Sequence, residues 1–355
     1  MKDNKKKTLS KRKRYFFSFL TMLFVLIIAG VIGEIMVRII NPQPYLYPRW
    51  DFSEQYGSLL FPNTTMTHKR PGNWTYKYHV NHYRYRGEPV PISNTYDKTN
   101  IIVLGDSYTF GNGVQNGEEF AAVMGNNLKE THNVINLGVG GWGITQQIRR
   151  FYEFGQLYKP EIVVLQFCSN DLKDNFKNRV TLIENGKFKF VNSNNSSNSL
   201  KKYVAGSIIQ KSQIYNLLRN SIYRMVDQRE VEKELKKMSD QQKDNKAAMT
   251  YENLHGELLE LFAKDLNEKG IRLMMISVNN HLEEQTTLLK SKVDELESKN
   301  YMEYHNVEPW FKDVNDFGSP EGHIWGKKGH EIIGKNLATL IKQQDSTSLK
   351  SEKDF

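Results

Sequence analysis

The stretch Ile101–Val114 (IIVLGDSYTFGNGV) holds the side chain best suited to chemistry, Ser107. It begins with a short apolar run, rich in β-branched residues and ended by a glycine turn, which predicts a buried strand. A serine at a tight strand-to-helix turn lies beside backbone N–H groups without partners, and these can stabilise an anion that forms on a substrate. The stretch alone fits equally well a turn in which Asp106 or Ser107 only caps the next helix.

Three later segments carry the residue types that a serine nucleophile needs. Val134–Gly143 (VINLGVGGWG) is an apolar strand with a glycine-rich turn, and Ile162–Leu172 (IVVLQFCSNDL) delivers polar residues to the end of a buried strand. Ser319–Gly334 (SPEGHIWGKKGHEIIG) places a histidine ahead of a helix. Together with the serine stretch, these segments resemble, in order, the four blocks of the SGNH (GDSL-type) hydrolase family.

The resemblance implies a role for individual residues. Ser107 would be the nucleophile and His323 the base that takes its proton, because a serine hydroxyl is a weak nucleophile until a base is within hydrogen-bond reach. The backbone N–H groups of Ser107 and Gly141 and the side chain of Asn170 would hold the oxyanion, and removing one such donor costs about 3 kcal/mol. Asp106 is expected to hold the turn.

The residue that orients the histidine departs from the family pattern. Members usually carry an aspartate two or three residues before the histidine, whereas Glu321 stands there in this chain. We therefore expect Glu321 to orient His323, with Asp316 and Asp313 as alternatives that would require a loop excursion. His330 is an alternative base; otherwise it belongs to the exposed first turn of a helix.

The N-terminus predicts a membrane segment. Met1–Arg14 carries eight Lys and Arg residues and one Asp, and Tyr15–Gly33 then has no charged residue. About 20 apolar residues suffice to cross a bilayer, and basic flanks tend to stay in the cytoplasm. A cleaved signal peptide begins in the same way, but its apolar core is usually roughly 7–15 residues long and a small-residue cleavage site follows. We therefore expect an uncleaved, single-pass signal anchor in the cell membrane, with the catalytic part extracytoplasmic.

The net charge and the single cysteine exclude other classes of site. The formal net charge is +9, of which the N-terminal tail contributes +7 through its eight positive and one negative side chains. The nearly balanced remainder argues against nucleic acid binding. Cys168 is the only cysteine, so no intramolecular disulfide can form, and we expect it to be a small buried residue. The histidines lack the spacing of metal ligands, and we expect neither a metal nor a cofactor.

The central region alternates apolar strands with helices, which predicts a parallel sheet with right-handed crossovers. With the family resemblance, this implies an α/β fold with a three-layer, flavodoxin-like parallel sheet over residues 99–344. The expected strands are Ile101–Leu104, Val134–Leu137, Ile162–Phe167 and Ile271–Val278. The expected helices are Glu118–Lys129, Ile144–Tyr158, Tyr251–Lys269 and Lys328–Lys342. Ligands of such sheets bind outside the carboxyl ends of the strands, where Ser107, Gly141 and Asn170 all fall.

A stalk with a small β-rich part is expected over residues 34–98. Alternating apolar residues predict a half-exposed strand there, formed by Trp74, Tyr76, Tyr78 and Val80. Such a strand either covers one edge of the main domain or offers aromatic rings to a sugar. Val80–Gly87 (VNHYRYRG) resembles a segment found ahead of the catalytic domain in membrane-anchored members of the family.

An insertion is expected at about residues 176–250, made of a loop and one or two surface helices. One helix has an apolar stripe of Ile208, Ile209, Ile214, Leu217, Leu218, Ile222 and Met225. The plain interpretation is that this stripe packs against the domain; a lid over the cleft, or a patch that touches the membrane or a partner, is the alternative. Residues 345–355 are expected to be a disordered tail.

These features predict an extracytoplasmic serine esterase that works through an acyl-serine intermediate. Membrane-anchored relatives are often associated with O-acetylation of envelope polysaccharides, which suggests an O-acetyl esterase, or an O-acetyltransferase that passes the acyl group to a sugar. A membrane-bound O-acyltransferase would then be a possible partner. The alternative is a catalytically inactive binding or assembly protein that kept the fold, and the departure at Glu321 is its main support.

Overall fold

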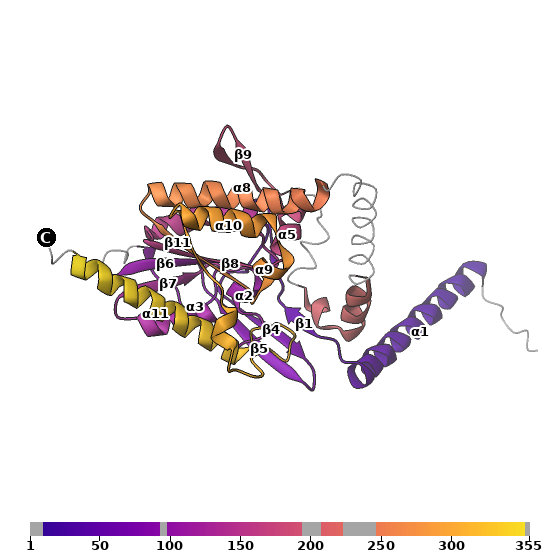
Figure 1. Ribbon diagram of the computed structural model, residues 1–355. Helices are drawn as coiled ribbons and strands as arrows, with labels where there is room; N and C mark the ends of the chain where they lie inside the picture. Colours follow the sequence, from indigo (N-terminus) through magenta and orange to yellow (C-terminus); the bar gives the residue numbers. More distant parts are fainter. Residues whose placement is uncertain (1–9, 93–97, 194–206, 223–245, 352–355) are drawn as a thin grey trace, which may run out of the picture.

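A five-stranded parallel sheet forms the centre of the computed structural model, which describes residues 10–92, 98–193, 207–222 and 246–351 (Figure 1). The strands are β6 (Thr99–Leu104), β7 (His132–Asn136), β8 (Ile162–Phe167), β11 (Arg272–Ser277) and β12 (Glu303–His305). Their order across the sheet is β12-β11-β8-β6-β7, and every neighbouring pair is parallel. Numbered along the chain, this is the flavodoxin-like order 2-1-3-4-5. The predicted fold class is confirmed.

Helices cover both faces of this sheet and complete three layers (Figure 1). One face carries α4 (Ile144–Glu153), α8 (Lys246–Glu268) and α10 (Leu288–Ser298), and the other carries α3 (Phe120–Leu128) and α11 (Lys327–Ser351). Successive strand side chains point to opposite faces, so β6 divides its apolar residues between two cores. Ile102 and Leu104 join the first core, and Ile101 and Val103 join the second. Burial on both faces explains why these strands read as continuous apolar runs.

The differences from the predicted elements lie at the edges of the domain. The sheet has a fifth strand, β12, that was not predicted, because its three residues are polar or aromatic and only half-buried. The prediction of a disordered tail is wrong as far as Ser351, since α11 continues to that residue; residues 352–355 lie outside the described part. Extending an existing helix costs much less than starting one, which accounts for the extra turns.

The N-terminal region consists of a long helix followed by small antiparallel sheets. Helix α1 (Lys11–Ile40) has no buried side chain and projects away from the domain in Figure 1. After it come a sheet of β1 (Tyr45–Tyr47), β4 (Thr64–Arg70) and β5 (Trp74–Val80) and a hairpin of β2 (Asp51–Ser53) and β3 (Gly57–Leu59). The predicted alternation along β5 is confirmed, with Tyr78 and Val80 buried. These strands share a core with Phe110, Val139 and Trp142. The small sheet therefore packs on the turns that follow β6 and β7, and not on an edge of the main sheet.

The insertion after β8 differs most from its prediction. It contains α5 (Asp171–Lys177), a hairpin of β9 (Thr181–Glu184) and β10 (Lys187–Phe190), a short 3₁₀ helix η4 (Ile208–Lys211) and a helix at 213–222. The prediction that the apolar stripe packs against the domain is wrong for four of its residues, which are exposed: Ile208, Ile209, Leu218 and Ile222. Met225, with the rest of 223–245, lies outside the described residues.

A buried arginine joins the N-terminal region to the turn that carries Ser107. The guanidinium of Arg86 donates to the carbonyl oxygens of Phe110 at 2.8 Å, Gly111 at 2.5 Å and Val114 at 3.0 Å. It also lies 3.3 Å from the carboxylate of Glu119, and the two side chains are 0% and 2% exposed. Its charge is thus fully desolvated, and both terminal nitrogens of the guanidinium are paired.

Replacing Arg86 by methionine should lower the free energy of unfolding by about 3–5 kcal/mol, because it leaves a buried carboxylate without its partner. The matched control is Arg84→Met, which breaks the partly exposed pair of Arg84 with Asp51 at 3.0 Å. Exposed pairs are worth about 0–1 kcal/mol, so this control should unfold nearly as the parent does. Urea unfolding followed by tryptophan fluorescence measures the free energy of unfolding of both variants. An equal loss of stability in the two variants would contradict the role given to Arg86.

Candidate active site

Ser107 is the first residue of a short helix at the carboxyl end of β6. This helix, α2 (Ser107–Phe110), is capped by Asp106, whose carboxylate accepts the N–H of Tyr108 at 2.9 Å. The turn requires Gly105, because a Cβ there would overlap the side chains of Thr109 and Gln166. Asp106 is fully buried, and burial raises the pKa of its carboxyl group. Asp106 therefore holds the turn, as predicted.

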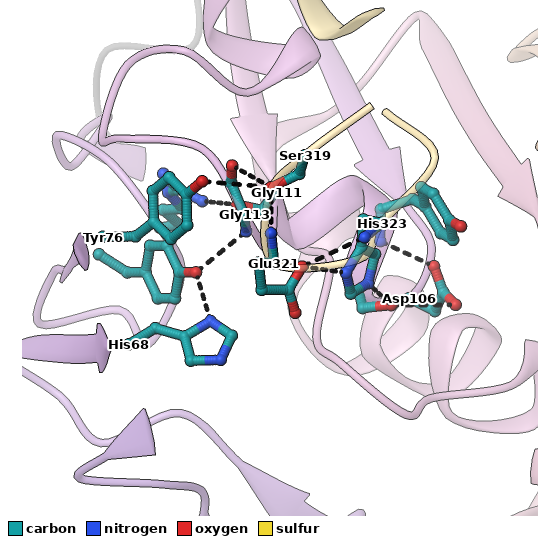
Figure 2. Close-up of polar contacts among 12 residues, drawn as sticks. His68, Tyr76, Asp106, Gly111, Gly113, Ser319, Glu321 and His323 are labelled. Carbon is teal, nitrogen blue, oxygen red and sulfur yellow. Dashed lines mark hydrogen bonds and ion pairs between the residues drawn. The ribbon is translucent and has the colours of Figure 1, made fainter. Parts of the chain in front are cut away.

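Ser107, His323 and Glu321 form one continuous chain of hydrogen bonds. Figure 2 shows the part of this chain between Glu321 and His323. The Nε2 atom of His323 lies 3.0 Å from the Oγ of Ser107, and its Nδ1 lies 2.6 Å from the Oε2 of Glu321. A carboxylate on Nδ1 fixes the tautomer in which Nε2 carries a free lone pair, so Nε2 can accept the serine proton. The three residues named from sequence are thus brought together in the order nucleophile, base and acid.

The charges of His323 and Glu321 support each other. Burial opposes protonation of the ring, but the hydrogen bond and charge of Glu321, aided by Asp106, outweigh it and raise the pKa of His323. Burial likewise disfavours the Glu321 carboxylate, yet the hydrogen bond and charge of His323 lower the pKa of Glu321 below its usual range. The pair therefore stabilises an imidazolium, the state that a histidine base reaches when it takes the proton of a serine nucleophile.

The alternative residues are placed elsewhere. His330 was predicted either as a base or as part of an exposed helical turn, and the second interpretation is wrong, because the residue is fully buried. Its Nδ1 lies 3.1 Å from the N–H of Phe120, and burial lowers the pKa of His330 to about 3. Asp313 and Asp316 are exposed, and the Nδ1 of His323 is already bonded to Glu321.

The three expected oxyanion donors differ in whether they are already engaged in other hydrogen bonds. The N–H of Ser107 starts a helix and so has no intrahelical acceptor. Gly141 is exposed, with a φ of +77° that suits glycine. Both hydrogens of the Asn170 amide are directed at carboxylates, those of Asp106 at 3.2 Å and Asp174 at 3.0 Å. Asn170 therefore lies beside the turn, and its donation to an oxyanion requires release of one of these bonds.

Comparison with known proteins assigns this domain. Residues 103–250 match the GDSL-like lipase/acylhydrolase family. The chain carries a GDSL-like acylhydrolase domain. This family consists of ester-bond hydrolases; the match includes Ser107, Gly141 and Asn170 and ends before Glu321 and His323.

Solved structures with a related fold include several hydrolases. A putative lipolytic protein of the G-D-S-L family from Desulfitobacterium hafniense DCB-2 is 12% identical, with 68% of this chain and 99% of that chain covered and a TM-score of 0.41. A psychrotrophic esterase from Pseudoalteromonas sp. is 11% identical, with 70% and 100% covered and a TM-score of 0.40. An acetyl xylan esterase is 14% identical, with 68% and 99% covered and a TM-score of 0.38. No curated protein matches the chain. Similarity at these sequence identities and TM-scores carries no argument about the chemistry of the site.

A loop contact holds Glu321 in place, and sequence reasoning missed it. The Oγ of Ser319 donates to the carbonyl of Gly113 at 2.8 Å and accepts the N–H of Glu321 at 3.3 Å. The small sheet adds two tyrosines from β5, with Tyr76 3.3 Å from the Ser319 hydroxyl and Tyr78 accepting the N–H of Gly113 at 3.0 Å. Figure 2 shows Tyr76 of the sheet beside Ser319, in the loop that carries Glu321 and His323. Gly111 and Gly113 indicate a tight turn after Ser107, but no local pattern identifies Ser319 as its partner.

Gly113→Ala should lower kcat by about 10²-fold with little change in KM, because misplacing a catalytic group by about 1 Å has such an effect. A Cβ at Gly113 would overlap the Ser319 hydroxyl and lie 2.9 Å from the Oε2 of Glu321, at a φ of +80°. Gly117→Ala is the matched control, since Gly117 has a φ of +85° but nothing within 4 Å of an added Cβ. Steady-state kinetics of both variants provide the test. Equal kcat values would show that the contact between Gly113 and Ser319 does not position Glu321.

The described parts of the chain offer no metal site at this position or elsewhere, since no group of three or more His, Cys, Asp or Glu side chains there is arranged to hold an ion. Cys168 is buried at the end of β8, and burial raises the pKa of its thiol. It therefore acts as a small buried residue, as predicted.

Proposed function

We propose that this protein is an extracytoplasmic serine esterase in which Ser107, His323 and Glu321 are the catalytic residues. The observation that carries the proposal is the unbroken hydrogen-bond chain of 3.0 Å and 2.6 Å from Ser107 through His323 to Glu321. The acylhydrolase domain supplies the reaction class, and the triad supplies a nucleophile, a base and an orienting acid.

Each step of ester cleavage has a residue to perform it. The Oγ of Ser107 attacks the ester carbonyl carbon while the Nε2 of His323 accepts the hydroxyl proton. The carbonyl oxygen becomes an oxyanion, which the N–H groups of Ser107 and Gly141 and the amide of Asn170 stabilise. The tetrahedral intermediate collapses, the alcohol leaves with the proton from His323, and an acyl-serine remains. Water, or a sugar hydroxyl in the transferase variant, then attacks the acyl-serine with His323 again acting as base.

The surroundings of Ser107 favour a short acyl group. A Cβ placed on Gly140 would lie 2.9 Å from the indole of Trp50 and 3.6 Å from the Cβ of Ser107, so the indole and Ser107 both flank Gly140. Trp50 is held edge-on to Phe110, with 5.6 Å between ring centroids. An aromatic ring next to the Gly140 turn favours a short acyl chain, and acetyl is the smallest common choice.

The proposed substrate is an O-acetyl group on an envelope polysaccharide, removed or transferred. Helix α1 is long and apolar enough to cross a membrane, which supports an anchor that holds the domain near the cell envelope. The half-buried rings of Trp74 and Tyr76 lie on the sheet that braces the acid and could stack on sugar rings. In the transferase variant, a membrane-bound O-acyltransferase would supply the acyl group. A non-catalytic role loses its main support, since Glu321 does contact His323.

A panel of esters tests this proposal. The full-length chain in detergent should release acetate from acetylated xylan and p-nitrophenol from the acetyl ester much faster than from the octanoyl ester. Trp50→Ala should raise the rate with the octanoyl ester selectively. Ser107→Ala is the control for background hydrolysis, and a parent chain no faster than this control on every ester would refute esterase function.

A further inference from the structure

Residues 207–222 place apolar side chains outside and polar side chains inside. Ile208, Leu218 and Ile222 are 73%, 58% and 55% exposed, the three highest values among the large apolar side chains described outside α1. Gln213 and Asn216, in contrast, are buried. This is the reverse of a surface segment that faces water, where the apolar side chains turn to the core.

The polar interior of this segment is held by hydrogen bonds. The Oε1 of Gln213 accepts the N–H of Gln43 at 2.5 Å, and its Nε2 donates to the carbonyl of Gln43 at 3.3 Å. The amide of Asn216 donates to the carbonyls of Gln210 at 2.7 Å and Ser212 at 2.8 Å. Buried polar groups that are satisfied in this way fix the orientation of the segment, and so fix its apolar face outward.

The segment is attached to the end of α1 that leads into the domain (Figure 1). The carboxylate of Glu34 accepts the N–H groups of Gln213 at 2.9 Å and Ile214 at 3.1 Å and the hydroxyl of Ser212 at 2.9 Å. It thereby caps the helix at 213–222 from a different helix. A Cβ on Gly33 would lie 3.1 Å from the side chain of Ile214, so the two helices approach closely at this glycine.

One apolar stripe therefore continues from α1 onto this helix. Ile214, Leu218 and Ile222 follow each other at a spacing of four residues, which puts them on one face of the helix. The stripe begins at Ile214 against Gly33 of α1 and ends at the exposed Ile222. Helix α1 has no buried side chain. The apolar surfaces of the two helices, which meet at Gly33 and Ile214, therefore form one patch that is open to the surroundings.

We propose that residues 208–222 lie in the interface of the same bilayer that α1 spans, with Ile208, Leu218 and Ile222 inserted at the boundary of the acyl chains. Amphipathic helices of this kind lie in the plane of the interface with their apolar face buried. The proposal rests on the membrane anchor given under Proposed function. The segment would hold the domain at a fixed height and orientation, so that the catalytic turn meets substrates at a set distance from the membrane.

Lipid contact can be measured in the full-length chain reconstituted into phosphatidylcholine–phosphatidylglycerol vesicles. Single cysteines at Leu218 and Ile222 carry an environment-sensitive fluorophore, and vesicles with spin-labelled acyl chains quench probes that touch lipid. The native Cys168 is buried and adds little background. Phe24→Cys on α1 reports insertion of the anchor, and Leu157→Cys, at a residue that is 47% exposed on the central domain, reports a site in water.

We expect quenching of the probes at Leu218 and Ile222 to be several-fold stronger than at Leu157. The probe at Phe24 should be quenched as well. Quenching at Phe24 without quenching at Leu218 and Ile222 would overturn the proposal and leave the anchor intact. A blue-shifted probe at Leu218 that lipid spin labels do not quench would also overturn it, in favour of a protein partner. Loss of quenching at all sites, Phe24 included, would refute the anchor itself.

Discussion

Ser107→Ala and His323→Ala should each lower kcat for ester hydrolysis by about 10⁴- to 10⁶-fold, because members of a catalytic triad act as a unit. The double variant should be little worse than either single one for the same reason. Neither side chain is part of the two large cores, so far-UV circular dichroism should be unchanged. The measurement is kcat for p-nitrophenyl acetate with the full-length chain.

The assignment of the base has its own control in His330. His330→Ala should reduce stability, since the ring is buried and its Nδ1 accepts the N–H of Phe120 at 3.1 Å. The folded fraction of this variant should retain near-parent kcat. Activity that survives in His323→Ala and disappears in folded His330→Ala would move the base to His330.

Glu321→Gln should lower kcat by about 10²- to 10⁴-fold with KM little changed, since a neutral amide neither stabilises the imidazolium nor enforces the tautomer. Glu321→Asp keeps the charge and should have a milder effect if the loop held by Ser319 adjusts. Near-parent activity in Glu321→Gln would contradict the role of Glu321. The orienting acid would then be Asp316 or Asp313, or the site would work with Ser107 and His323 alone.

The same variant predicts a pH shift with a definite sign. Ester cleavage requires neutral His323, so kcat/KM rises as pH increases through the pKa of that ring. In the parent, Glu321 raises this pKa, whereas burial alone would lower it. Glu321→Gln should therefore move the rising limb of the profile to lower pH, while Gly117→Ala should leave it in place. A rising limb that is unchanged, or that moves to higher pH, would contradict the conclusion that Glu321 raises the pKa of His323.

The sequence predicted the central sheet well because its signals are local. Continuous apolar runs such as Ile162–Phe167 are typical of strands buried on both faces, and the structure has β8 at those same residues. Strand β12 was not predicted because its residues Glu303, Tyr304 and His305 form no apolar run. A half-buried edge strand is specified by its pairing with β11, which is not readable from its own residues.

The proposed catalytic residues could be named from motifs, but the contacts that hold them in place could not. Glu321 and His323 are two residues apart, so their contact was accessible to sequence reasoning. The bond from Ser319 to Gly113 joins segments 206 residues apart, and no local pattern indicates it. The apolar stripe at 208–222 was predicted to pack inward because periodicity reveals an apolar face without saying what covers it. The contacts of Glu34 supply the missing information, since they place the segment beside α1.

The claim that Ser107 attacks the substrate can be tested by trapping it. A p-nitrophenyl phosphonate ester reacts with an activated serine, whose Oγ forms a bond to phosphorus as p-nitrophenolate leaves. Intact mass spectrometry should show addition of one phosphonyl group, and peptide mapping should place it on Ser107, with no addition in Ser107→Ala and much slower addition in Glu321→Gln. A parent protein that gains no phosphonyl group, or gains it at Ser319 or Ser169 instead, would contradict the account.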